Sequence, residues 1–304
     1  MKKKIFKVIA FTMITMGVFY KSVSANELEY VVGKNRYETA AKISDKMSYD
    51  ALILVNGESL ADGLSSSGLS GTLNAPILLT TKDRLPDVTL EKIKTVNKVY
   101  LVGGEGVISK NIENQIRELG KQVIRLSGRD RYLTSHAVAD EISKYKVIDE
   151  IFYVNGIDGQ ADAMSIAPVA AKNANPVILT NGKSTNYKKK VKSYSIGGRG
   201  VLNSSFDSFT ERVSGVNRFE TNAKVIEKFF DDITHVNLSK SHVLIDALTA
   251  SALKQPVVLI NDSSDKSILA GAKEATVFGD ISQIAVNRAK SYIFNDTVVF
   301  YSQH

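Results

Sequence analysis

The chain of 304 residues contains no cysteine and no tryptophan, and it has only five prolines. The absence of cysteine excludes thiol nucleophiles, cysteine-ligated zinc and iron–sulfur clusters. It also leaves stability to a packed core rather than to disulfides. The absence of tryptophan removes the broadest aromatic face on which a neutral sugar could stack. The composition therefore favours ionic recognition of a charged ligand over stacking on a neutral glycan.

Sequence signatures of catalysis are also missing. The chain has no His-Glu-x-x-His pair, Gly-x-Ser-x-Gly elbow, Walker motif or Gly-x-Gly-x-x-Gly fingerprint. Its four histidines lack metal-ligand spacing. The segment Gly103-Gly104-Glu105-Gly106 fits a tight turn from strand to helix. We therefore expect no enzymatic activity, no cofactor and no metal.

Residues 1–25 have the pattern of a secretory signal peptide. Four lysines in the first seven residues precede an apolar run from Val8 to Tyr20, and Val23-Ser24-Ala25 supplies the small residues of a cleavage site. A retained N-terminal anchor is the alternative. No later stretch has the roughly 18 apolar residues that a membrane span needs. We expect a secreted protein, with no membrane span in the mature chain.

Loss of this leader changes the charge balance. The net charge of +7 includes five lysines of the leader, so the mature chain carries 7 − 5 = +2. So small a charge argues against nucleic acid as a partner. An anionic partner would have to be held by local clusters, such as Arg125, Arg129 and Arg131, or the lysines between Lys188 and Lys192.

Two phrases recur three times, in the same order along the chain. One begins with glycine, contains Asn or Asp followed by arginine and an aromatic residue, and ends with threonine; it occupies 33–39, 128–134 and 215–221. The other is a proline followed by four mainly apolar residues, at 76–80, 176–180 and 256–260. Such repetition indicates an internal triplication with units of roughly 90 residues, the size of a small domain. We place the units at 26–124, 125–211 and 212–304.

Each unit alternates short apolar runs with helical segments. This alternation predicts an α/β fold with parallel sheets that are covered on both faces. Asn35, Asp130 and Asn217 are suited to cap the helices that follow them. No flexible linker separates the units, so we expect one compact body.

This ordered set of motifs resembles the cell-wall-binding repeat 2 family of clostridial surface proteins. The shared motifs are the Gly-x-x-Arg-aromatic-x-Thr helix start, the Asn-Gly…Ala-Asp-Ala/Gly segment, the Pro-Ile-Leu-Leu phrase and the Gly-Gly turn. The resemblance implies three Rossmann- or Toprim-like repeats packed as a pseudo-threefold triangle. It also implies non-covalent binding of an anionic, teichoic-acid-like polysaccharide at the cell wall or S-layer. Family members often carry an additional effector domain, which we do not find here.

The third unit departs from the family pattern. Asn237 lacks the glycine that follows Asn56 and Asn155, and Phe278-Gly279 replaces the double glycine. We therefore expect the third site to be weaker than the other two, or purely structural.

Three arginines at the predicted helix starts are the first candidates for contacting the polymer: Arg36, Arg131 and Arg218. A guanidinium offers a planar fork of donors to phosphate oxygens. Free amides and the dipole of a helix start would also favour an anion. The alternative is that these arginines form internal salt bridges between units, with Asp62, Asp162 and Asp246 as possible partners.

Further candidates lie on the predicted strands. Ligands of open α/β sheets bind beyond the carboxyl ends of the strands, where Asn56, Asn155, Thr80 and Thr180 are expected. The apolar phrases themselves are expected to be core strands, and their family role would be to fix the strand end where a groove opens. Their members are Ile77, Leu78, Leu79, Val177, Ile178, Leu179, Val257, Val258 and Leu259.

The leading hypothesis is a secreted module that anchors to the wall through several weak sites on one charged polymer. One rival is a wall hydrolase of the amidase type, which would need a metal triad or a nucleophile–base pair. A second rival is an adhesin or S-layer lattice component that binds other surface proteins.

Overall fold

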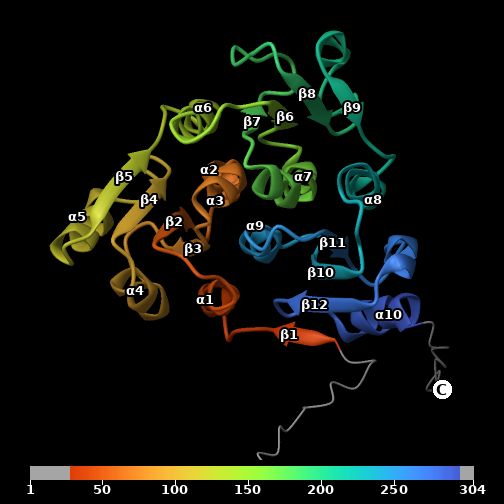
Figure 1. Cartoon of the computed structure of the whole chain (residues 1–304), viewed down its shortest axis with the longest axis horizontal. Coiled ribbons are helices and arrows are strands. Elements are labelled where there is room, and N and C mark those ends of the chain that lie inside the picture. Colours follow the sequence, from red (N-terminus) through yellow and green to blue (C-terminus); the bar gives the residue numbers. More distant parts are fainter. Residues whose placement is uncertain (1–27, 295–304) are drawn as a thin grey trace, which may run out of the picture.

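Three four-stranded sheets, one for each repeat, make up the framework of the molecule (Figure 1). The structure is a computed structural model and describes residues 28–294, so the predicted signal peptide lies outside the described residues. All strand pairs in the three sheets are parallel. The prediction of three parallel α/β repeats arranged as a triangle is confirmed.

The first sheet has the strand order β3–β2–β4–β5. Its elements in chain order are β2 (Ala51–Asn56), α2 (Leu60–Gly63), α3 (Ser67–Leu73), β3 (Ile77–Thr80), α4 (Asp87–Lys94), β4 (Lys98–Val102), α5 (Lys110–Glu118) and β5 (Gln122–Leu126). The two innermost strands are nearly continuous apolar runs because helices cover both faces. Between β2 and β3 the chain forms two short helices, α2 and α3.

The second sheet repeats this order as β7–β6–β8–β9. Its elements are α6 (Arg131–Ile142), β6 (Glu150–Asn155), α7 (Gln160–Asn173), β7 (Val177–Thr180), β8 (Lys192–Ile196), the 3-10 helix η1 (Ser204–Ser208) and β9 (Glu211–Val213). Asn155 pairs with Thr180 in the register, just as Asn56 pairs with Thr80 in the first sheet.

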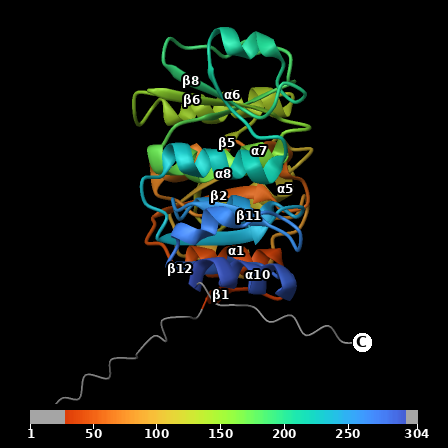
Figure 2. The same ribbon diagram turned by 90° about the vertical axis from the view of Figure 1, so that its right-hand side faces the viewer.

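The third sheet takes its fourth strand from the beginning of the chain. Its order is β11–β10–β12–β1, and β1 (Glu29–Val31) pairs with β12. The helix after β1, α1 (Arg36–Ser44), belongs to the first unit. The other elements of the third unit are α8 (Arg218–Phe229), β10 (His235–Lys240), α9 (Ile245–Ser251), β11 (Val257–Ile260), the 3-10 helix η2 (Ser267–Gly271), β12 (Glu274–Phe278) and α10 (Gln283–Phe294). Figure 2 shows the first and last parts of the described chain side by side.

Each unit passes the chain to the next through a shared connection. β5, β9 and β1 each form an edge strand of a different sheet. The helix that follows each of them (α6, α8 and α1, respectively) packs against the apolar strand of the next sheet. The pairing of β1 with β12 therefore closes the three units into a ring.

The centre of the ring is built from the small-residue helices α3, α7 and α9 (Figure 1). A Cβ atom on Gly71 of α3 would lie 1.8 Å from the carbonyl oxygen of Ala171 in α7. The hydroxyls of Ser67 in α3 and Ser251 in α9 are 3.0 Å apart. Glycine, alanine and serine are thus required here because the helix backbones approach one another closely.

Candidate functional site

The carboxyl end of each sheet carries an arginine from the start of a helix. The Nη1 of Arg131 donates to the carbonyl oxygen of Gly156 at 2.7 Å, and Arg218 donates to that of Ser241 at 2.7 Å. Arg36 makes the same bond to Gly57. Within residues 28–294 this is the one hydrogen bond of each guanidinium, and none of the three joins an ion pair. Arg36 and Arg218 are exposed and Arg131 is half-buried, and the remaining donors of each guanidinium have no acceptor among the described residues.

The helix starts themselves are capped internally. The Oδ1 of Asn35 accepts from the amides of Tyr37 and Glu38, both at 3.0 Å, and the carboxylate of Glu38 accepts from Lys34 N at 2.9 Å. This resembles a capping box, with the glutamate bonded to the residue before the cap, and Asn217 and Glu220 repeat it. The expectation that free helix amides would help to hold an anion is therefore wrong at these two helices. The arginine side chains remain as the donors.

Arginine, an aromatic ring and the last leucine of the apolar phrase converge on one glycine. A Cβ on Gly57 would lie 3.1 Å from the ring of Tyr37, 3.3 Å from Leu79 Cβ and 3.4 Å from Arg36 Cδ. Gly156 has the same surroundings in the second unit. The ring, the leucine and the arginine thus pack closely around the glycine in the first two units, whereas Ser241 takes its place in the third and still accepts from Arg218.

The other members of the apolar phrases lie in the core, as the sequence predicts. All nine residues proposed from these phrases are at most 3% exposed. Their part in any binding is therefore to fix the strand ends rather than to offer a surface.

The polar residues at the strand ends are used inside the protein. Asn56 Nδ2 donates to Val107 O at 2.7 Å, and Asn155 Nδ2 donates to Val201 O at 2.8 Å. The hydroxyls of Thr80 and Thr180 donate to backbone carbonyls at 3.0 and 3.1 Å. All four side chains are buried. They shape the edge of the sheet, and a direct role as donors to a polymer stays a prediction.

Three buried aspartates lie where one unit meets the next. Asp62, Asp162 and Asp246 stand beside the turn glycines that follow the third strand of each sheet. Those glycines have φ values of +130°, +120° and +75°, which other residues rarely adopt. Burial raises the pKa of all three carboxyl groups, and that of Asp162 to about 7.

The arginine of the following unit lies close enough to each aspartate to lower its pKa. The charge of Arg131 partly offsets the raised pKa of Asp62, Arg218 does so for Asp162, and Arg36 does so, together with Lys240, for Asp246. None of these pairs is within 4.0 Å in the part of the chain that the structure describes. At each of the three junctions, the predicted aspartate and arginine are therefore neighbours, but they form no direct salt bridge within the described residues.

Arg125, which the sequence placed in a cluster for anions, is a structural residue. Its Nε contacts Glu113 at 2.9 Å, and its Nη1 donates to Gly103 O at 2.8 Å. Although burial of Glu113 raises its pKa, hydrogen bonds from Lys110, Arg117 and Arg125 lower it to about 2.

Arg212 makes the equivalent bonds to Asp207 and Gly197 in the second unit. The repeated Arg-Leu/Val-Ser-Gly sequence at 125–128 and 212–215 was the signal that could have identified these two residues.

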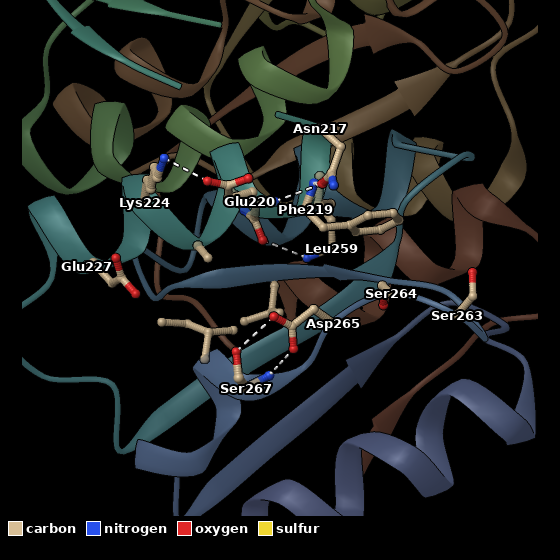
Figure 3. Close-up of a pocket in the computed structure, with 14 residues that line it drawn as sticks. Asn217, Phe219, Glu220, Lys224, Glu227, Leu259, Ser263, Ser264, Asp265 and Ser267 are labelled. Atoms are coloured by element: carbon tan, nitrogen blue, oxygen red, sulfur yellow. Dashed lines mark hydrogen bonds and ion pairs between the residues drawn. The ribbon is translucent and has the colours of Figure 1, made fainter. Parts of the chain in front are cut away.

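A cavity beside the helix start recurs in two units. In the third unit it has a volume of about 520 Å³ and lies between α8 and the loop after β11, with Phe219, Leu259 and Asp265 in its wall (Figure 3). In the second unit a cavity of about 260 Å³ has Tyr132 and Leu179 at the matching positions. The apolar phrase and the helix start thus border the same open space.

Within residues 28–294, no cluster of three or more histidine, aspartate or glutamate side chains is arranged to hold a metal ion. In the same range, no helix has the length and apolar character needed to cross a membrane.

Comparison with protein families gives three matches along this chain. The sequence model described as "Cell wall binding domain 2 (CWB2)" matches residues 31–113, 125–207 and 212–299. Among solved structures, Cwp6 from Clostridium difficile superposes with a TM-score of 0.81 at 30% identity, over 88% of this chain and 48% of Cwp6. Cwp8 from the same organism gives 0.82 at 30% identity, over 89% and 52%.

Two curated relatives come from Bacillus subtilis (strain 168). The N-acetylmuramoyl-L-alanine amidase LytC is 30% identical over 98% of this chain, and the amidase enhancer is 31% identical over 85%. The chain spans 65% of the length of the first relative and 38% of the second.

Proposed function

Since the chain belongs to the cell wall binding domain 2 family, we propose that it attaches non-covalently to an anionic, teichoic-acid-like polysaccharide of a Gram-positive wall. The observation that carries the proposal is the threefold arginine at the carboxyl edges. Within the described residues each guanidinium makes one backbone bond, which leaves its other donors without a protein acceptor. Phosphate oxygens are the natural acceptors for such a fork.

Three sites on one rigid ring suit a polymer with repeating charges. Once one arginine is engaged, the next phosphate is held at a high effective concentration, so weak contacts add up to firm attachment. Because the arginines are exposed or half-buried, salt should screen this attraction.

The test is retention of the mature protein on purified walls, with and without the anionic polymer. We expect Arg36→Gln, Arg131→Gln and Arg218→Gln together to lower retention at least about ten-fold, since avidity is lost along with the contacts. We also expect wild-type retention to fall with added sodium chloride.

A matched triple variant controls for net charge. Lys46, Lys144 and Lys228 lie at or just beyond the opposite ends of the same three helices. Replacing them with glutamine removes the same charge at the amino edges of the sheets, and retention should change little. Equal loss in both triple variants, or equal retention on stripped walls, would contradict the proposal.

The name of one relative raises an amidase as the second candidate. The three matched segments are separated only by residues 114–124 and 208–211, which leaves little room for a catalytic domain between them. We propose a binding role without catalysis. Clearing of cell wall in a zymogram with added metal would overturn that part. Attachment to other S-layer proteins is a further partnership, which pull-down from wall-free extracts would test.

A further inference from the structure

The third unit lacks the asparagine that closes the carboxyl edge of the other two sheets. The register pairs Asn56 with Thr80, Asn155 with Thr180, and Lys240 with Ile260. Lysine and isoleucine therefore replace the asparagine and threonine that tie the first two edges together. The side-chain bonds to Val107 O and Val201 O have no counterpart from Lys240 among the described residues.

The segment that covers the edge is also shorter in the third unit. In the first two units the next helix begins seven positions after the turn glycine, at Lys110 after Gly103 and at Ser204 after Gly197. In the third unit it begins only four positions later, at Gln283 after Gly279. In the first two units, this segment is bonded to the loop after the apolar strand, by Ser109 N to Lys82 O at 2.9 Å and Asn203 N to Gly182 O at 2.8 Å.

These changes leave a cavity of about 300 Å³ between the ends of β10 and β11 and the start of α10. It shares the 261–265 loop with the cavity in Figure 3, and Ser263 borders both. The loop is fixed from within, because the buried ammonium of Lys266 donates to Asn261 O at 2.7 Å and to Ser264 O at 3.0 Å. The 261–265 loop therefore forms a fixed wall of the cavity.

The lining combines cationic, hydroxyl and apolar groups. Lys240 is half-buried and joins no hydrogen bond or ion pair through its ammonium within residues 28–294. Ser241 is 1% exposed, and its hydroxyl has no partner in the described structure. His242 is exposed, and Val243 and Ile281 supply apolar surface.

Acidic side chains also lie near the cavity. Asp262 belongs to the lining, and Asp246 is close enough for Lys240 to lower its pKa against the effect of burial. A buried hydroxyl without a partner is costly unless a ligand or water satisfies it. The arrangement thus suits a small molecule with an anionic group and an apolar face.

We propose that this cavity binds one hexose-sized sugar unit bearing a phosphate or carboxylate group, in the third unit only. Lys240 would hold the anionic group and Ser241 a hydroxyl, with the sugar ring against Val243 and Ile281. The volume is at the lower end of the range of about 300–1,000 Å³ for small-molecule sites. The choice of a saccharide rests on the proposed wall function, because a charged wall polymer presents such units at its ends and branches.

Titration of the isotope-labelled mature protein with glucose 1-phosphate, followed by amide NMR, tests the site. We expect shifts confined to residues 240–243 and 281–285, and weaker or no shifts with glucose or inorganic phosphate. Lys240→Asn, which installs the residue of the other units, should weaken binding at least about ten-fold through loss of a charge-assisted bond. Ser241→Ala should weaken it less and leave the fold intact.

Lys82→Asn is the matched control, since Lys82 is an exposed lysine in the corresponding loop of the first unit; it should leave the titration unchanged. Absent shifts, equal shifts at all three edges, equal affinity for inorganic phosphate, or unchanged binding by Lys240→Asn would overturn the proposal. These outcomes are separate from wall retention. If the triple arginine variant keeps full retention while the sugar phosphate still binds, the wall proposal falls and the cavity stands.

Discussion

At the scale of single residues, the buried aspartates make the stability of the fold depend on pH. Asp162 keeps a carboxyl group at a junction between units, beside Gly197 and near the charge of Arg218. Burial raises its pKa to about 7, against an ordinary value of about 3.9. The folded protein therefore binds this proton more tightly than the unfolded chain does.

The sign of the pH effect follows from that difference. The stabilisation is complete below the ordinary pKa and is lost as the pH rises from about 4 through about 7. Asp162→Asn should thus raise the free energy of unfolding at pH 8 by up to roughly 4 kcal/mol, since each of the about three pKa units corresponds to about 1.4 kcal/mol. It should also flatten the pH dependence in this range. Denaturant unfolding at pH 5 and pH 8 measures both effects.

The exposed Asp158 lies on the loop before the same helix, so Asp158→Asn serves as the control and should change stability by less than about 0.5 kcal/mol. A loss of stability in Asp162→Asn at pH 8 would show instead that the charged carboxylate is needed at the junction.

The residue scale also marks the limit of sequence reasoning at the site. The positions of Asn56 and Thr80 at strand ends were predicted, yet their roles were not. Asn56 bonds to Val107, 51 positions away, and no local pattern reveals such a partner. The arginines could be identified because their phrase is repeated, whereas the carbonyls they bind become adjacent only when the sheets form.

At the scale of elements, the parallel strands were predictable because apolar runs covered on both faces have few alternatives. The edge strand β1 was not, since it has only three residues and its partners in β12 lie almost the whole chain away. The close contact of the central helices could not be predicted, because it depends on the packing of three units.

Gly71 tests that close contact in the hub. Alanine normally favours a helix over glycine by about 1 kcal/mol, but here the added Cβ would meet Ala171 O at 1.8 Å. We expect Gly71→Ala to lower the free energy of unfolding by about 3 kcal/mol, because helices α3 and α7 must separate. Thermal or denaturant unfolding measures the change.

A methyl group added to Gly104 would have no other atom within 4 Å, so Gly104→Ala is a control expected to change stability by less than about 0.5 kcal/mol. If Gly71→Ala were neutral or stabilising, the first two units would not be in backbone contact.

At the scale of the whole molecule, one short strand makes the sheet pairing that joins the first and last parts of the described chain. β1 completes the sheet of the third unit and leads directly into α1, which packs on the first sheet. Without β1, the edge of β12 would be open to pairing with other chains. The order of the motifs predicted three units, but this closure required the fold.

Val31 and Tyr30 allow the closure to be tested within the same strand. Val31 is buried in the core at 6% exposure, whereas Tyr30 on the opposite face is 53% exposed. Val31→Asp should lower the free energy of unfolding by roughly 3 kcal/mol, because it removes apolar burial and places a carboxylate in the core. Tyr30→Asp introduces the same charge and should cost less than about 1 kcal/mol.

Hydrogen exchange then locates the damage. Local opening exposes amides in the cooperative unit that has been weakened, so Val31→Asp should speed exchange in β12 and β10 before it does so in β6 and β7. The second unit makes no strand pair with β1, and its sheet should stay protected longest. Uniform acceleration across all three sheets would mean that the units unfold together, with the ring as one cooperative body rather than three units joined by a strand.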